Sequence, residues 1–394
     1  MRRTHLGAML VTPAVLLAAC GGSSPATPSA GITTSTTATS GSSSTTASAP
    51  GTTAATGGAD PCTVAKQSPP TGAIAADFAT ALAFAPDGRL FWAERSGTVR
   101  VLQDGAPRVF AQVSTVTTEP GGGYSERGLL GLAISPTFAS DRYVYAFFST
   151  SDRAHQQIVR WTDCAGQGTD VKVIVELPAG ADCCHKGGRL AFGPDGKLYV
   201  TLGDQHTESA AQDTSDPRGK VLRYNPDGTV PADNPFGDPV WAFGFRNPFG
   251  LAIAPSGQVA VTGNGPTGDA GSPPTGYDVV VANAGRGAGY QWPVCYGYSH
   301  PIRAGAACPG AEPDWSSEAT AIVPTGATFV NAAGPGGTAG KLVFCSLNAG
   351  MQIFSAGSPH ATLTSDVAEC RLDVKQGPDN ALYYSDTTKI YRKG

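Results

Sequence analysis

The chain has 394 residues, of which 15% are charged, and its formal net charge at neutral pH is −4. This balance excludes the strongly basic surface that a nucleic-acid partner requires. Since no stretch has the periodicity of a long amphipathic helix, a mainly helical fold is excluded as well.

Residues 1–19 are predicted to be a lipoprotein signal peptide. They begin with a positive stretch that includes Arg2 and Arg3, continue with an apolar run too short to span a membrane, and end in small residues before Cys20. Cys20 is the predicted site of lipidation, so we expect an exported protein anchored to a membrane by its lipid alone, in a periplasm or at the cell surface. A plain secretory signal with an incidental cysteine is the alternative.

Residues 20–59 consist mainly of Ser, Thr, Ala, Gly and Pro and carry almost no large apolar side chain. Such a stretch buries too little apolar area to offset the entropy of ordering it, so we predict a flexible tether. Residues 60–394 then form the folded domain.

The cysteines indicate disulfides. Apart from Cys20 the chain has eight, an even number, as expected in an oxidising compartment. Proximity in sequence favours a Cys295–Cys308 pair and a Cys345–Cys370 pair. A zinc site is the competing interpretation, although the ligand spacings typical of zinc are missing. Sequence leaves the pairing of four cysteines open: Cys62, Cys164, Cys183 and Cys184.

One phrase recurs along the folded part: an apolar pair, then Pro-Asp-Gly or a relative, then a short alternating strand. Its copies are residues 84–92, 192–200, 253–259 and 376–384, with a weaker copy at 134–147. Proline presets the dihedral angle of the turn and Asp-Gly reverses the chain. Each copy therefore predicts a hairpin between two strands.

Further short apolar strands follow these hairpins, at residues 99–102 and 221–224 for example. Serial four-stranded units predict a β-propeller, in which each blade covers the apolar face of its neighbour. Six blades would take about 56 residues each, so we predict an all-β fold: a six-bladed propeller of four-stranded antiparallel blades. A pair of β-sandwiches is the alternative.

Four loop segments carry candidate chemistry: residues 126–133, residues 185–196 with the following Gly203-Asp204, residues 241–251, and residues 263–266 followed by 277–278 and 289–293. In order and spacing they resemble the glucose/sorbosone dehydrogenase family, soluble quinoprotein sugar dehydrogenases that bind pyrroloquinoline quinone (PQQ) and calcium. The resemblance runs from about residue 80 to residue 293. It implies an oxidoreductase that acts on a small-molecule sugar and passes electrons to an acceptor that the sequence does not identify.

The family resemblance gives His185 the role of general base, which takes the proton of the sugar C1 hydroxyl while hydride leaves for the quinone. Histidine suits this task because its pKa lies near neutrality. Glu126 is expected to bind a sugar hydroxyl or the cofactor. The alternatives are a structural histidine and a solvated loop carboxylate.

The same resemblance assigns Arg246 and Asn247 to the cofactor, with the arginine donating to the quinone carbonyls. An arginine that ties two blades together is the alternative for Arg246. The backbone carbonyls of Gly265 and Pro266 would hold the calcium ion, an assignment that rests on resemblance alone.

The chain departs from the family pattern at several positions. Asn348 stands where glucose-oxidising members have a lysine, Leu372 stands in place of a flanking arginine, and Arg371 is out of register. Burying a tricarboxylate with so few cations is costly. Before the histidine, Cys184 replaces a carboxylate of some members, and Val279 follows Asp278 where the family often has Glu.

The leading hypothesis is a PQQ- and calcium-dependent aldose dehydrogenase that oxidises a C1 hydroxyl to the lactone. A propeller that lacks catalysis and binds a glycan or a protein at the cell surface is the second hypothesis, favoured by the missing cations. A calcium-dependent lactone hydrolase is the third, and no set of side-chain carboxylates and asparagines can be assembled for it from sequence.

Overall fold

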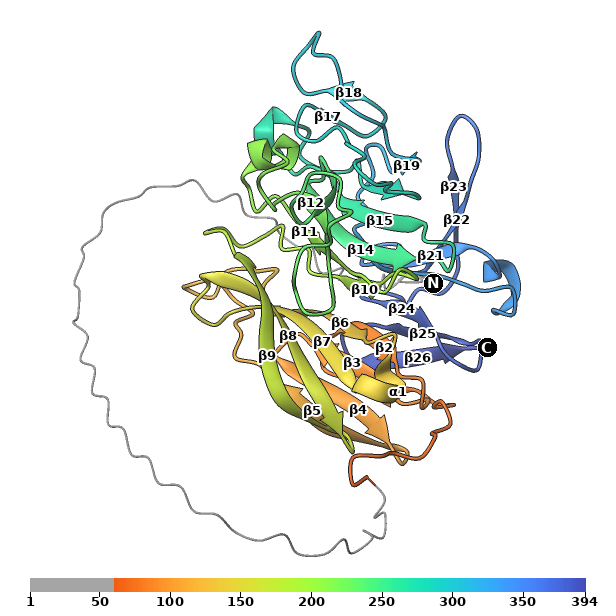
Figure 1. The fold of residues 1–394 in the computed structure, drawn as a ribbon. Coiled ribbons are helices and arrows are strands. Elements are labelled where there is room, and N and C mark those ends of the chain that lie inside the picture. Colours follow the sequence, from red (N-terminus) through yellow and green to blue (C-terminus); the bar gives the residue numbers. More distant parts are fainter. Residues whose placement is uncertain (1–59) are drawn as a thin grey trace, which may run out of the picture. The chain divides into compact units, whose positions relative to one another are not determined.

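The computed structural model describes residues 60–394 of the chain. The predicted signal peptide and tether (residues 1–59), with the lipidation site Cys20, lie outside the described residues. The described part is almost entirely β-structure and forms six four-stranded antiparallel sheets that follow one another around a ring (Figure 1). The predicted six-bladed β-propeller is therefore confirmed. In the described part, the helices are too short to reach across a bilayer.

The first three blades follow the chain without interruption. Blade 1 contains β2 (Ala79–Phe84), β3 (Leu90–Glu94), β4 (Thr98–Gln103) and β5 (Ala106–Gln112). Blade 2 contains β6 (Leu129–Ile134), β7 (Tyr143–Ser149), β8 (His155–Cys164) and β9 (Gln167–Pro178), with the short helix α1 (Phe138–Asp141) between β6 and β7. Blade 3 contains β10 (Leu190–Phe192), β11 (Leu198–Leu202), β12 (Lys220–Tyr224) and β13 (Val240–Phe243), with a 3-10 turn at Glu208–Gln212.

In the last three blades, blade 4 carries the longest insertion, between β16 and β19. Blade 4 contains β14 (Asn247–Ile253), β15 (Val259–Asn264), β16 (Val279–Val281) and β19 (Trp315–Ser316), with a 3-10 turn at Asp269–Gly271 and a projecting hairpin of β17 (Cys295–Tyr296) and β18 (His300–Pro301). Blade 5 contains β20 (Pro324–Phe329), β21 (Leu342–Ser346), β22 (Gln352–Ser355) and β23 (Thr362–Ser365), with a 3-10 turn at Gly336–Thr338. Blade 6 contains β24 (Val374–Gln376), β25 (Leu382–Ser385), β26 (Lys389–Lys393) and β1 (Ile74–Ala75).

The recurring Pro-Asp-Gly phrase forms the turn between the first two strands of a blade, as predicted. In blade 1 the Ala85 amide donates to the Arg89 carbonyl at 3.0 Å, and Gly88 has φ of +90°. A Cβ at position 88 would lie 2.1 Å from the Gln67 carbonyl oxygen, so this turn requires glycine. Asn380 takes the equivalent left-handed position in blade 6, with φ of +64°. The weaker copy at 134–147 differs, because α1 replaces the tight turn there.

The hydrophobic core is divided among the junctions between neighbouring blades. Each of the six junctions holds one cluster of buried apolar side chains, which alternate along the strands with residues facing the opposite neighbour. In blade 1, for example, Phe91 packs toward blade 2 and Trp92 packs toward blade 6. No blade completes its core alone, so the ring must close for any blade to be stable.

Two features close the ring. The N-terminal strand β1 pairs with β26 as the outer strand of blade 6, and Figure 1 shows blade 1 (orange) beside blade 6 (blue). Near the centre, the guanidinium of Arg189 donates to backbone carbonyls from four other blades. These acceptors are Thr80, Leu130 at 3.2 Å, Phe249 at 3.0 Å and Leu372 at 2.8 Å.

Four disulfides link the eight described cysteines. The predicted pairs Cys295–Cys308 and Cys345–Cys370 are confirmed. The four cysteines whose pairing was open form Cys62–Cys164, which ties the start of the domain to blade 2, and the vicinal pair Cys183–Cys184.

Candidate active site

The predicted site residues come from loops at one end of blades 2 to 4. In blade 3, antiparallel pairing of β10 with β11 brings the segment before Leu190 beside the segment after Leu202. In blade 4, the register of β14 and β15 places Asn247 directly opposite Asn264. Pairing of adjacent strands therefore brings together His185 with Asp204, 19 positions apart, and Asn247 with Asn264, 17 positions apart.

His185 is held by a carboxylate from the neighbouring strand. Its Nδ1 lies 2.5 Å from Oδ1 of Asp204, and the indole N–H of Trp292 donates to Oδ2 of the same carboxylate at 2.7 Å. His185 is 3% exposed and Asp204 is fully buried. The orienting group that Cys184 cannot supply is therefore provided by Asp204, which follows β11.

A second imidazole covers the first. His206 stacks on His185 with ring centroids 3.9 Å apart and an interplanar angle of 18°. Burial lowers the pKa of His206, and the neighbouring His185 lowers it further. Its Nε2 is buried and has no hydrogen-bond partner among the described residues. Both histidines have positive φ, near +55°, a conformation that costs energy for residues other than glycine and that is concentrated at functional sites.

Two predicted site residues from different blades contact each other. The side-chain amide of Asn247 donates to Glu126 at 3.2 Å, and Glu126 also accepts the backbone N–H of Lys186 at 3.2 Å. This contact brings the loop before blade 2 against the start of blade 4. Burial lowers the pKa of the Lys186 ammonium to about 8, and the positive charge of Arg127 lowers it as well. The Lys186 ammonium donates to the Ala179 carbonyl at 2.5 Å.

Arg246 lies in the same cluster but is already paired. Its Nε donates to Asp269 at 2.6 Å, one terminal nitrogen donates to Asp269 at 3.0 Å and to Thr267 at 2.8 Å, and the other donates to the Asn264 carbonyl at 3.3 Å. The guanidinium carbon also lies 5.7 Å from the ring centre of Trp292. The alternative role, a tie between blades, is not what these contacts show, because all these hydrogen-bond acceptors belong to the last residue of β15 or to the loop after it.

A cavity of about 60 Å³ adjoins Arg246 and is lined by Asn264, Gly265 and Pro266, among others. The amide oxygens of Asn247 and Asn264 are buried and lack hydrogen-bond donors among the described residues. Unpaired oxygen acceptors beside backbone carbonyls are ligands that calcium accepts readily. The residues at this position therefore fit a hard divalent cation.

Asp278 holds the loop that contains Gly265 through hydrogen bonds to backbone amides. Its carboxylate accepts the backbone N–H of Gly265 at 2.8 Å and those of Ile322 and Val323 at 2.7 and 2.8 Å. Burial raises the pKa of this carboxyl, and the three amides oppose the rise. Asp278 thus holds the cavity loop against blade 5, a role that sequence had not assigned to it.

In the part of the chain that the structure describes, the C-terminal positions where cations were expected, Asn348 and Leu372, present none to the site. Asn348 donates to the Ala321 carbonyl, Arg371 donates to the Leu347 carbonyl, and Leu372 is buried. Arg246 is therefore the guanidinium at the candidate site that could meet an anionic cofactor, and it fits a planar quinone if its contact with Asp269 is exchanged.

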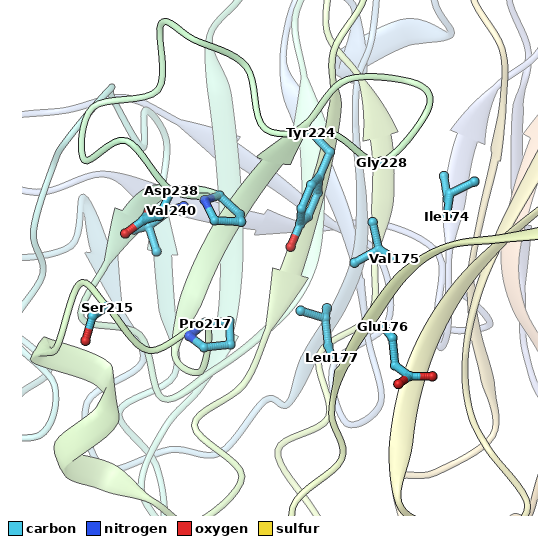
Figure 2. A pocket seen from close by; sticks show the side chains of 11 residues that line it. Ile174, Val175, Glu176, Leu177, Ser215, Pro217, Tyr224, Gly228, Asp238 and Val240 are labelled. Atoms are coloured by element: carbon cyan, nitrogen blue, oxygen red, sulfur yellow. Dashed lines mark hydrogen bonds between the residues drawn. The ribbon is translucent and has the colours of Figure 1, made fainter. Parts of the chain in front are cut away.

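A separate cavity of about 390 Å³ lies between β9 of blade 2 and the end of blade 3 (Figure 2). Its lining includes Glu176, Tyr224 and Asp238 and none of the predicted site residues. The larger cavity is therefore not where the candidate chemistry lies.

Sequence reasoning assigned no role to Asp204, His206, Asp269 or Trp292, although Asp204 and Trp292 lie within the segments that attracted attention. The position of Asp204 directly after a predicted strand, in the phrase Gly203-Asp204, is a usable signal. A Cβ at Gly203 would lie 2.2 Å from the His185 carbonyl oxygen, which shows how closely the two segments approach. His206 and Asp269 carry no such signal.

The structure is a six-bladed propeller, and loops at one end of its blades bring together a histidine held by a carboxylate, an arginine and unpaired amide oxygens. These features define a class of β-propeller proteins with a candidate active site in the loops. The family model "Glucose / Sorbosone dehydrogenase" matches residues 76–391. The chain belongs to this family, so the predicted membership and the prediction of a sugar dehydrogenase-type oxidoreductase are confirmed.

Relatives with names and structures agree with this placement. Quinoprotein glucose dehydrogenase B of Acinetobacter calcoaceticus is 31% identical over 55% of this chain and 50% of its own length, so the match spans half of that relative. The apo-form soluble aldose sugar dehydrogenase of Escherichia coli is 26% identical, with a TM-score of 0.66 over 80% of this chain and 96% of that one. The PQQ-bound aldose sugar dehydrogenase of Streptomyces coelicolor, 24% identical with a TM-score of 0.64 over 82% and 99%, shares the fold.

Proposed function

We propose that the protein is a PQQ- and calcium-dependent aldose dehydrogenase that oxidises the C1 hydroxyl of a sugar to the lactone, with His185 as general base. The observation that carries the proposal is the contact of His185 Nδ1 with Asp204, 2.5 Å long and completely enclosed. Membership of a sugar dehydrogenase family supports the reaction class.

The contact with Asp204 sets the proton arrangement of the imidazole. A carboxylate at Nδ1 favours the tautomer that carries its proton there, which leaves the lone pair of Nε2 to accept one. Among the described residues no hydrogen bond engages Nε2 of His185. When Nε2 takes the hydroxyl proton, Asp204 stabilises the imidazolium that results, and Trp292 keeps the carboxylate in place.

The residues that would hold the cofactors come from the same cluster of loops as this imidazole. Arg246 and Asn247 would bind the quinone, Gly265 and Pro266 would bind calcium through their carbonyls, and Glu126 would bind the sugar or the quinone. When bound, PQQ would supply the acceptor for the hydride and calcium would supply Lewis-acid polarisation of the quinone, with an external acceptor taking the electrons.

The test is dye reduction by the full chain loaded with PQQ and calcium, over a panel of aldoses, with His185→Asn as the variant. We expect turnover for at least one aldose, lactone as product, and a loss of at least a hundredfold in the variant. The variant should bind PQQ in calorimetry as the parent protein does. PQQ-dependent turnover that survives in His185→Asn would remove His185 as the base.

The second candidate is a propeller that binds a glycan and has lost catalysis. It is favoured by Asn348 and Leu372, which are uncharged residues at positions where a cation was expected. Calorimetry distinguishes the two. Heat on adding an oligosaccharide and none on adding PQQ, with no dye reduction, would establish the binding module and sink the dehydrogenase.

We further propose that the protein works at a membrane surface, anchored through Cys20. The support is the sequence pattern alone, because residues 1–59 lie outside the described part. Fractionation of cells that produce the wild type or Cys20→Ala tests this. Wild-type protein in the membrane fraction and variant in the soluble fraction are expected, and identical partitioning would refute the anchor.

A further inference from the structure

Arg246 has little hydrogen-bonding capacity left for a ligand. A guanidinium has five N–H donors. Arg246 already uses four of these donors: two donate to Asp269, one to Thr267 and one to the Asn264 carbonyl. A single N–H on one terminal nitrogen remains, so the two-pronged donation that makes arginine a good carboxylate or quinone partner is already used within the protein.

The charge of Arg246 is cancelled as well. The side chains of Asp269 and Arg246 are 7% and 6% exposed, so water screens the attraction between their charges only weakly. Although burial raises the pKa of the Asp269 carboxyl, the hydrogen bond and the charge of Arg246 lower it to about 2. The carboxylate is therefore ionised at neutral pH and would repel a second anion brought to the same guanidinium.

The hydrogen bonds that attach the segment carrying Asp269 to the rest of the described chain all come from Arg246, which donates to Asp269 and to the Thr267 hydroxyl. The other hydrogen bonds within residues 267–273 are local: the Thr267 amide donates to Asp269, Gly268 donates to the Pro273 carbonyl, and Ser272 donates to the Asp269 carbonyl. Separating Asp269 and Thr267 from Arg246 would thus free a short surface segment without breaking a hydrogen bond of any strand.

We propose that Asp269 is a built-in competitor for Arg246, which occupies the guanidinium in the ligand-free protein and is exchanged for an oxygen of the anionic quinone when the cofactor binds. This inference rests on the proposed function, since it concerns the same arginine. In this arrangement the buried guanidinium of Arg246 stays paired until an anionic ligand oxygen replaces the carboxylate of Asp269.

The experiment is calorimetric titration of the calcium-loaded protein with PQQ, comparing wild type with Asp269→Asn. The amide keeps the shape of the side chain and removes its charge, so we expect the dissociation constant to fall at least tenfold. The matched control is Asp379→Asn, which removes a carboxylate from a two-contact arginine pair on the outer part of blade 6. It should leave the affinity unchanged.

The outcomes separate this inference from the proposed function. If wild type binds PQQ and Asp269→Asn binds no more tightly, the competitor is refuted and the dehydrogenase stands. If neither binds PQQ, both are refuted. Tighter binding in Asp379→Asn too would assign the gain to net charge and overturn a specific role.

A measurement on the wild type covers the case in which Asp269→Asn does not fold. Carbon-13 NMR of the aspartate carboxyl groups follows their titration with and without saturating PQQ. A released Asp269 should titrate near the ordinary value of about 4 in the complex, whereas a carboxyl that still titrates near 2 would overturn the exchange.

Discussion

The centre of the ring and the candidate site each bury an arginine, and they pair it differently. Arg189, 4% exposed, donates to backbone carbonyls from four other blades. Arg246, 7% exposed, donates mainly to the carboxylate of Asp269 and to other atoms of one loop. The first arrangement cannot change unless the ring opens, while the second can change when one loop moves.

The difference follows from what each acceptor is attached to. Backbone carbonyls at the inner strands are fixed by the sheets, so a guanidinium among them joins blades that are distant in sequence. A side-chain carboxylate on a short local segment can be replaced by a ligand oxygen of the same charge. Burial of a charged group therefore does not by itself distinguish scaffold from site; the attachment of its partners does.

The largest expected effect is on the scaffold. Arg189→Met removes the guanidinium that donates to all four carbonyls, of which Leu372 keeps the backbone N–H of Gly326 as a donor, so we expect a loss of roughly 3 to 5 kcal/mol in the free energy of unfolding. Urea denaturation measures it. The control Arg392→Met, on a half-exposed pair, should cost about 1 kcal/mol or less. Equal losses in both variants would contradict the role given to the central arginine.

The next effect is on the site and should leave the scaffold unchanged. Asp204→Asn removes the carboxylate that sets the tautomer of His185, so kcat for dye reduction should fall on the order of a thousandfold. PQQ affinity and the urea midpoint should change little by comparison. A fall of less than tenfold would show that His185 does not depend on this partner.

A smaller effect is expected one contact further from the imidazole. Trp292→Phe keeps most of the packing and removes the N–H that donates to Asp204, so kcat should fall about tenfold. Trp241→Phe is the control, because the indole of Trp241 donates to the Ala284 carbonyl outside the site. If both variants lose activity equally, the effect is one of packing.

The smallest effect is on acid stability. Because the folded-state pKa of Asp269 is about 2 and the unfolded value is near 4, the pair with Arg246 stabilises the fold fully above about pH 4, and this contribution is lost as the pH falls toward 2. Urea denaturation at pH 5, 3 and 2 should show a steeper decline for wild type than for Asp269→Asn. Parallel declines would mean that the ion pair does not stabilise the free protein.

Parts of the site were predictable and parts were not. Glu126, His185, Arg246 and Asn247 lie in segments that match a family pattern, and the structure gathers them. The acceptor of His185 was not predicted, because Asp204 meets the histidine only through pairing of β10 with β11. The roles assigned to Glu126, His185, Arg246 and Asn247 stay predictions until activity is measured.

The disulfides show the same division. The pairs separated by 13 and 25 residues were predicted from proximity, whereas Cys62–Cys164, separated by 102, was not. Closing a short loop between two thiols costs little chain entropy, so proximity in sequence favours such a pair. Proximity gives no such guide for cysteines that lie far apart in the chain. The adjacent Cys183 and Cys184 bond to each other, an outcome that sequence had left open.

Sequence by itself determined the hairpins, the blade repeat and therefore the propeller, because turn chemistry and strand alternation act over a few neighbouring residues. Tertiary structure alone decided that Arg189 joins the blades, that Asp204 and Trp292 support His185, and that Asp269 forms an ion pair with Arg246. Those contacts depend on strand pairing within a blade or on how the closed ring positions separate blades, and no local pattern encodes the distances between the residues involved.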